Sequence, residues 1–123
     1  MKKHPILDAL QKASRGLLFM SEEDAKLEPF LWKDGGDVTK ENVLQHVGSD
    51  DGTPAEETTL DNFFRAVPKE HQPKFAKLLQ VLRGQLSGTK VYKLGDESEK
   101  PVYVVGKTAD GKLAGVKTTV VET

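Results

Sequence analysis

The groups best suited to chemistry in this sequence are oxygen-bearing side chains at two places far apart along the chain. Three consecutive carboxylates, Glu22, Glu23 and Asp24, stand between two apolar runs. The final strand-like run ends with Glu122 and Thr123. If the sequence ends on a strand, the hydroxyl and the carboxylate of Thr123 are held in position. Such oxygens are hard ligands, suited to a cation such as Mg²⁺ or to a basic groove on a partner.

The acidic segment has two interpretations. Ser21 can cap a helix whose first turn carries the three carboxylates, because the helix dipole favours negative charge there. Alternatively, the carboxylates lie at the exposed tip of a loop and reach cations of a partner. The apolar residues on either side, at 19–20 and 30–32, favour the loop. Buried flanks would hold it rigid, and a rigid loop loses less entropy on binding.

No pattern in the sequence is typical of an enzyme or of a cofactor site. The three histidines, His4, His46 and His71, belong to no metal-binding motif. No serine has the context of a nucleophile elbow, and the glycine-rich stretches match no phosphate-binding loop. We therefore expect a protein without catalytic residues or a cofactor, and with no metal of its own in the free state.

The composition predicts one domain over residues 1–123. Lysine and arginine number 18 and the acidic residues 19, a balance that argues against general nucleic-acid binding. Cysteine is absent, which excludes disulfides and thiolate chemistry. No run approaches the roughly 20 apolar residues that a membrane span needs. These features predict a cytoplasmic protein.

Apolar periodicity predicts four helices. The first begins at Pro5 and ends near Gly16, and the next is capped by Thr39 and stopped by Gly48. A short helix is expected around residues 60–64, with Thr59 or Asp61 at its start. A longer helix is expected from Pro73 to Gly88. Residues 17–20 extend the first helix or form a strand, and residues 21–29 form an exposed loop. The aromatic side chains at 30, 32, 63, 64 and 75 are expected in the core, with Trp32 also a candidate interface anchor.

The last third of the sequence predicts strands. Residues 30–32 form a short strand. Of three further strands, the first begins at Val91, the second covers 102–105 and the third covers 112–121. Asp110 and Gly111 form a hairpin turn between the last two. Paired valines near the end indicate a strand covered on both faces. Helices gathered on an antiparallel sheet place the fold in the α+β class.

Several blocks of the sequence resemble the family of the nuclease A inhibitor, a small protein that inhibits a cyanobacterial sugar-non-specific nuclease. They are SRGLLFMSE, FLW, VYKLG, VYVVGKT and GKLAGVKTTVVET. The similarity extends from about Ile6 to Thr123. It implies a three-layer α/β/α sandwich with a central, mainly antiparallel sheet, similar also to pathogenesis-related class 1 proteins. It implies a monomeric, non-enzymatic, intracellular inhibitor that forms a 1:1 complex with a ββα-metal endonuclease.

The resemblance also implies which residues contact the partner. In the family, the glutamate of the FMSE motif and the terminal threonine approach the catalytic Mg²⁺ of the nuclease. These positions are Glu22 and Thr123 in this sequence. Glu23, Asp24 and Glu122 would then make supporting acidic contacts. No direct contact with nucleic acid or with a membrane is implied.

One segment departs from the family pattern. Residues 66–75 are short here, where the nuclease A inhibitor carries a longer acidic and aromatic insertion. If that insertion steers the inhibitor toward a basic nuclease, its loss weakens the encounter. The alternative interpretation is therefore an inhibitor-like protein-binding module with a different partner and no nuclease inhibition.

Overall fold

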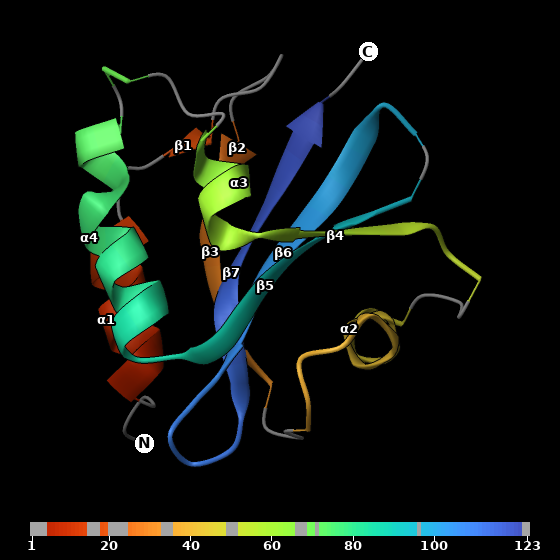
Figure 1. The fold of residues 1–123 in the computed structure, drawn as a ribbon, viewed down its shortest axis with the longest axis horizontal. Coiled ribbons are helices and arrows are strands. Elements are labelled where there is room, and N and C mark those ends of the chain that lie inside the picture. Colours follow the sequence, from red (N-terminus) through yellow and green to blue (C-terminus); the bar gives the residue numbers. More distant parts are fainter. Residues whose placement is uncertain are drawn as a thin grey trace.

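The computed structural model describes residues 5–14, 18–19, 25–32, 36–48, 52–65, 69–70, 72–95 and 97–121 (Figure 1). Its elements in chain order are α1 (Pro5–Ser14), β1 (Leu18–Phe19), β2 (Ala25–Lys26), β3 (Glu28–Trp32), α2 (Lys40–Val47), β4 (Ala55–Thr59), α3 (Leu60–Arg65), α4 (Gln72–Gly84), β5 (Ser87–Leu94), β6 (Glu99–Lys107) and β7 (Leu113–Val121).

Five strands form an antiparallel sheet in the order β3-β7-β6-β5-β4, and β1 and β2 form a two-stranded sheet. The centre of the sheet is the meander β5–β6–β7, which confirms the three strands predicted in the last third of the sequence. The turn between β6 and β7 contains Asp110 and Gly111, and the φ of Gly111 is 83°. The predicted α+β class is confirmed.

Helices and sheet residues together form two separate buried clusters. Apolar side chains of α1, α3 and α4 join one buried cluster with sheet residues such as Val104 and Val116. Val43 and Leu44 of α2 join a second cluster with sheet residues such as Val105 and Leu113. Neighbouring residues of a strand point to opposite faces, so the adjacent valines 104 and 105 enter different clusters. Figure 1 shows α1 and α4 side by side, away from α2.

Three predicted helix boundaries are confirmed: both ends of α2 and the start of α3. The Thr39 hydroxyl accepts from the Asn42 N–H at 3.1 Å at the start of α2, and Gly48 ends that helix with φ 75°. The Thr59 hydroxyl likewise accepts from the Asn62 N–H at 3.1 Å before α3. In the part of the chain that the structure describes, no helix is long and apolar enough to cross a membrane.

Helix α4 is shorter than its apolar spacing predicts. It ends at Gly84, and β5 begins at Ser87, although Leu86 continues the apolar period and is buried. The Thr89 hydroxyl donates to the Leu82 carbonyl at 3.0 Å. This bond satisfies one of the carbonyls left free at a helix end, so the chain can turn into the sheet earlier than predicted.

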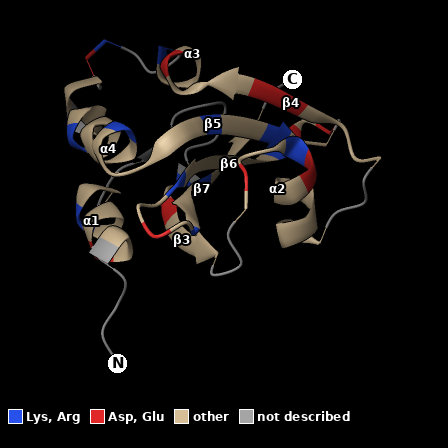
Figure 2. Cartoon of the chain, turned by 60° about the horizontal axis from the view of Figure 1, so that its bottom comes forward, with Lys and Arg blue, Asp and Glu red and all other residues tan. Residues whose placement is uncertain are grey.

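One predicted loop contains strands, and one further strand was not predicted. Residues 25–26 form β2 and residue 28 begins β3, within the segment 21–29 expected as a loop. Strand β4, of sequence AEETT, was not predicted because its residues lack an apolar alternation. Its pairing with β5 and the approach of Glu56 to Lys93, 3.8 Å between charged atoms, account for it. Figure 2 shows the acidic β4 beside the basic positions of β5.

Candidate functional site

The five residues predicted to contact a partner, Glu22, Glu23, Asp24, Glu122 and Thr123, all lie outside the described residues. The structure does describe the strands that flank both segments. These strands are β1 and β2 around the acidic segment, and β7 before the end of the sequence. The geometry of the candidate site therefore rests on how these three strands lie together.

The acidic segment connects two strands that pair with each other. Leu18 of β1 is opposite Lys26 of β2, and Phe19 is opposite Ala25, in antiparallel register. A short antiparallel pair brings the two ends of its connection close together. Phe19 and Ala25, the described residues that flank the acidic segment, therefore lie at the same place on the molecule.

That place is next to β7. Both β1 and β2 contact β7, and in Figure 1 they lie toward the end of the sheet at which β7 finishes. Glu28 of β3 is opposite Lys117 of β7 in antiparallel register. The chain before Glu28 and the chain after Lys117 therefore continue from the same end of the sheet. The last described residue of β7, Val121, is opposite Glu99 of β6.

Exposed carboxylates are found at this end of the sheet. Three glutamates are exposed there: Glu28 at the start of β3, Glu99 at the start of β6, and Glu97 just before β6. The Lys117 ammonium lies 5.7 Å from the centre of the Tyr103 ring, which is within the range of a cation–π contact. These carboxylates lie beside Lys26, Lys100 and Lys117, so charges of both signs are found at the strand ends that flank the predicted contact residues. The exposed carboxylates among them can pair with cations of a basic partner.

The described residues contain no group of three or more histidine, cysteine or acidic side chains arranged to hold a metal. His46 illustrates the structural use of a histidine. Its Nδ1 donates to the Asn42 carbonyl at 2.8 Å, and its ring stacks on Trp32 with 4.6 Å between ring centres. Trp32 also stacks on Phe30 at 4.5 Å and is half-buried against the second core cluster. Among the predicted core aromatics, those at 63, 64 and 75 are buried.

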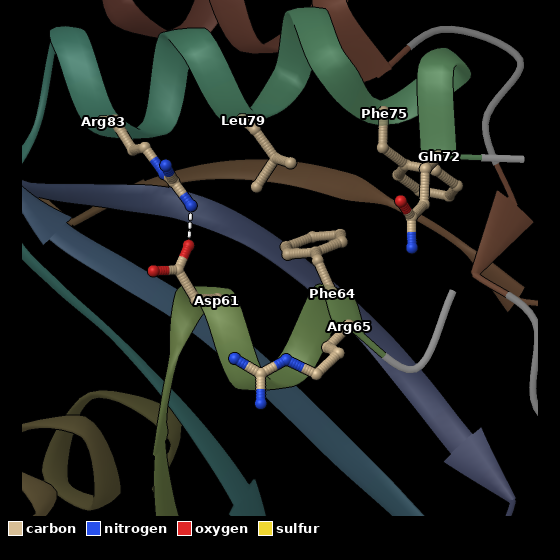
Figure 3. A pocket seen from close by; sticks show the side chains of 7 residues that line it. All are labelled: Asp61, Phe64, Arg65, Gln72, Phe75, Leu79 and Arg83. Atoms are coloured by element: carbon tan, nitrogen blue, oxygen red, sulfur yellow. Dashed lines mark ion pairs between the residues drawn. The ribbon is translucent and has the colours of Figure 1, made fainter. Parts of the chain in front are cut away.

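A hollow between α3 and α4 is a second feature of the surface, and the sequence did not predict it (Figure 3). It has a volume of about 320 Å³. It is lined by Asp61, Phe64, Arg65, Gln72, Phe75, Leu79 and Arg83. The spacing of residues 72, 75, 79 and 83 indicates one stripe of a helix, but nothing in the sequence places α3 opposite that stripe.

Comparisons with known proteins identify the family. A search of curated proteins gives no match. The sequence model described as "Nuclease A inhibitor-like protein" matches residues 4–123, nearly the whole chain. The matched range includes both segments that carry the predicted contact residues. The chain belongs to the nuclease A inhibitor-like family.

Proposed function

We propose that this protein inhibits a sugar-non-specific endonuclease of the ββα-metal class by occupying its active site. The observation that carries the proposal is the match to the nuclease A inhibitor-like family over residues 4–123. Glu22 and Thr123 approach the catalytic Mg²⁺ of the nuclease. Glu23, Asp24 and Glu122 make supporting contacts with basic side chains around it.

The strand register supports a joint action of the two segments. Glu22 precedes Glu28 by six residues, and Thr123 follows Lys117 by six residues, while Glu28 and Lys117 are opposite one another. The contacts of β1 and β2 with β7 support the same arrangement. Two segments that leave one end of a sheet can enter one active site together.

The chemistry suits inhibition. Mg²⁺ takes oxygen ligands in a nearly octahedral shell and usually keeps several waters. A carboxylate of Glu22 and the hydroxyl of Thr123 can replace water or approach it where a substrate phosphate would bind. The nuclease then loses access to its substrate without any reaction on the inhibitor. The nuclease surface that binds the polyanionic substrate is expected to be basic. It would attract the exposed carboxylates of Glu28, Glu97 and Glu99.

The first test compares variants in a cleavage assay. Glu22→Gln and Thr123→Val each remove one metal-directed group with little change in shape. We expect each to weaken inhibition of a ββα-metal nuclease by about tenfold or more, because Glu22→Gln removes a charged contact and Thr123→Val removes a hydroxyl ligand at a buried interface. The matched control is Glu41→Gln, which removes the same charge from an exposed position in the first turn of α2.

The controls decide how the result is interpreted. Circular dichroism must show that each variant is folded. Equal inhibition by wild type, Glu22→Gln and Thr123→Val would contradict the metal-directed mechanism. An equal loss in Glu41→Gln would instead attribute the effect to total charge.

A further inference from the structure

The α3–α4 hollow, defined above by its seven lining residues, has the form of a small ligand site. On α4, its residues recur every three or four positions from Gln72 to Arg83, so they share one side of the helix. Asp61, Phe64 and Arg65 of α3 line the opposite wall. Its volume of about 320 Å³ falls at the small end of the range for ligand pockets.

The middle of the hollow is apolar. The rings of Phe64 and Phe75 lie 5.6 Å apart between centres, at an interplanar angle of 48°. Leu79, which is half-buried, extends into the hollow between the two helices in Figure 3. The two rings are only 4% and 3% exposed and form the floor of the hollow, whereas an apolar group placed against Leu79 would displace water from its surface, which favours binding.

One end of the hollow is charged. The Arg83 guanidinium forms an ion pair with Asp61 across the space between the helices (Figure 3). The side chains are 55% and 65% exposed, so water weakens this pair. A second hollow of about 290 Å³ also borders Asp61 and Arg83, and reaches Gly88 and Thr89. There is thus room beside the guanidinium for another anion, which could bind it through two parallel hydrogen bonds.

We propose that the α3–α4 hollow binds a small carboxylate with an aromatic or aliphatic body. The carboxylate pairs with Arg83, in competition with Asp61, and the apolar body lies along Leu79 toward the two phenylalanine rings. Arg83 and Phe75 are eight residues apart on α4, which corresponds to about 12 Å along the helix. This length admits two fused rings or a short acyl chain. The proposal does not depend on the nuclease-inhibitor function.

The probe is naphthoate, titrated into the folded full-length protein and followed by calorimetry and by amide chemical shifts. Its neutral amide, naphthamide, has the same rings without the negative charge. We expect naphthoate to bind at least about tenfold more tightly than naphthamide, because a charged partner strengthens a hydrogen bond to guanidinium. The shifts should concentrate on α3 and on residues 72–83.

Two substitutions give opposite expected effects. Arg83→Gln removes the cation and should weaken naphthoate binding by about tenfold. Asp61→Asn removes the competing anion and should strengthen it by about threefold, a gain that misfolding cannot produce. Lys77→Gln is the matched control, since Lys77 is an exposed cation on α4 outside the hollow.

Several results would overturn the proposal. They are no binding of naphthoate at millimolar concentration, equal affinity for naphthoate and naphthamide, and shifts located elsewhere on the protein. Unchanged or weaker binding in Asp61→Asn would also overturn it, because the ion pair would then not compete with the ligand.

Discussion

At the scale of single residues, Tyr92 is the clearest example of a buried polar group with a defined partner. Its side chain is fully buried, and its hydroxyl donates to the Glu57 carboxylate at 3.0 Å. Burial, followed by the hydrogen bond and the negative charge of Glu57, raises the pKa of Tyr92 above its ordinary value. This bond connects the edge strand β4 to β5, where the sequence of β4 alone predicts no strand.

The raised pKa of Tyr92 makes stability depend on alkaline pH. The folded protein keeps the phenol proton where the unfolded chain, with a tyrosine pKa of about 10, releases it. The folded state therefore binds more protons above pH about 10, and the free energy of unfolding falls as pH rises further. Tyr92→Phe should lose about 1 kcal/mol at neutral pH and show a shallower alkaline decline.

Urea unfolding of wild type and Tyr92→Phe between pH 8 and about pH 11 measures this difference. Subtracting the two curves removes the contribution of the lysines, which both proteins share. A constant difference across that pH range would contradict the assignment of a raised pKa to Tyr92.

The sequence predicted the residues of the candidate site through oxygen chemistry and family resemblance. Those contact residues stay a prediction. The pairing of β3 with β7 could not be predicted, because no local pattern brings residue 28 opposite residue 117. The residues of the α3–α4 hollow were missed for a similar reason. Leu79 and Arg83 look like ordinary members of an amphipathic helix until α3 is placed opposite them.

At the scale of elements, β7 depends on a close approach to its neighbour that only glycine allows. Gly115 is buried and lies opposite Val105 of β6, and a Cβ added to it would overlap the Val104 carbonyl oxygen. This overlap involves backbone, so side-chain movement cannot relieve it. Gly84, the exposed last residue of α4, has no atom within 4 Å of an added Cβ.

These two glycines give a paired prediction. Gly115→Ala should destabilise the protein by about 2 kcal/mol or more, because overpacking next to backbone cannot relax easily. Gly84→Ala should be neutral or stabilise by up to about 1 kcal/mol, since alanine favours helix and restricts the unfolded chain. Thermal unfolding of both variants tests the difference, and similar melting temperatures would contradict the described packing of β7 against β6.

The element boundaries also indicate what sequence patterns can predict. Thr39, Gly48 and Thr59 were interpreted correctly because caps act within a few residues. The end of α4 and the existence of β4 depend on contacts across the fold, Thr89 to Leu82 and Glu57 to Tyr92. Local propensity carries no information on such contacts, so the end of α4 was predicted incorrectly and β4 was not predicted.

At the scale of the whole molecule, the α+β class followed from the sequence because long apolar periods are strong local signals. The buried residues on both faces of β6 and β7 are consistent with the paired valines that indicated coverage from two sides. The three-layer arrangement implied by the family resemblance stays a prediction, as does the identity of the nuclease.

The family membership, the approach of the β1–β2 pair to β7 and the exposed glutamates near its end lead to one central claim, inhibition of a nuclease at its metal site. The most direct test is titration of wild-type protein against a ββα-metal non-specific nuclease with Mg²⁺ and plasmid DNA. We predict that cleavage falls in proportion to added inhibitor and stops near one equivalent. Undiminished cleavage in the presence of a large excess of folded protein would contradict the claim.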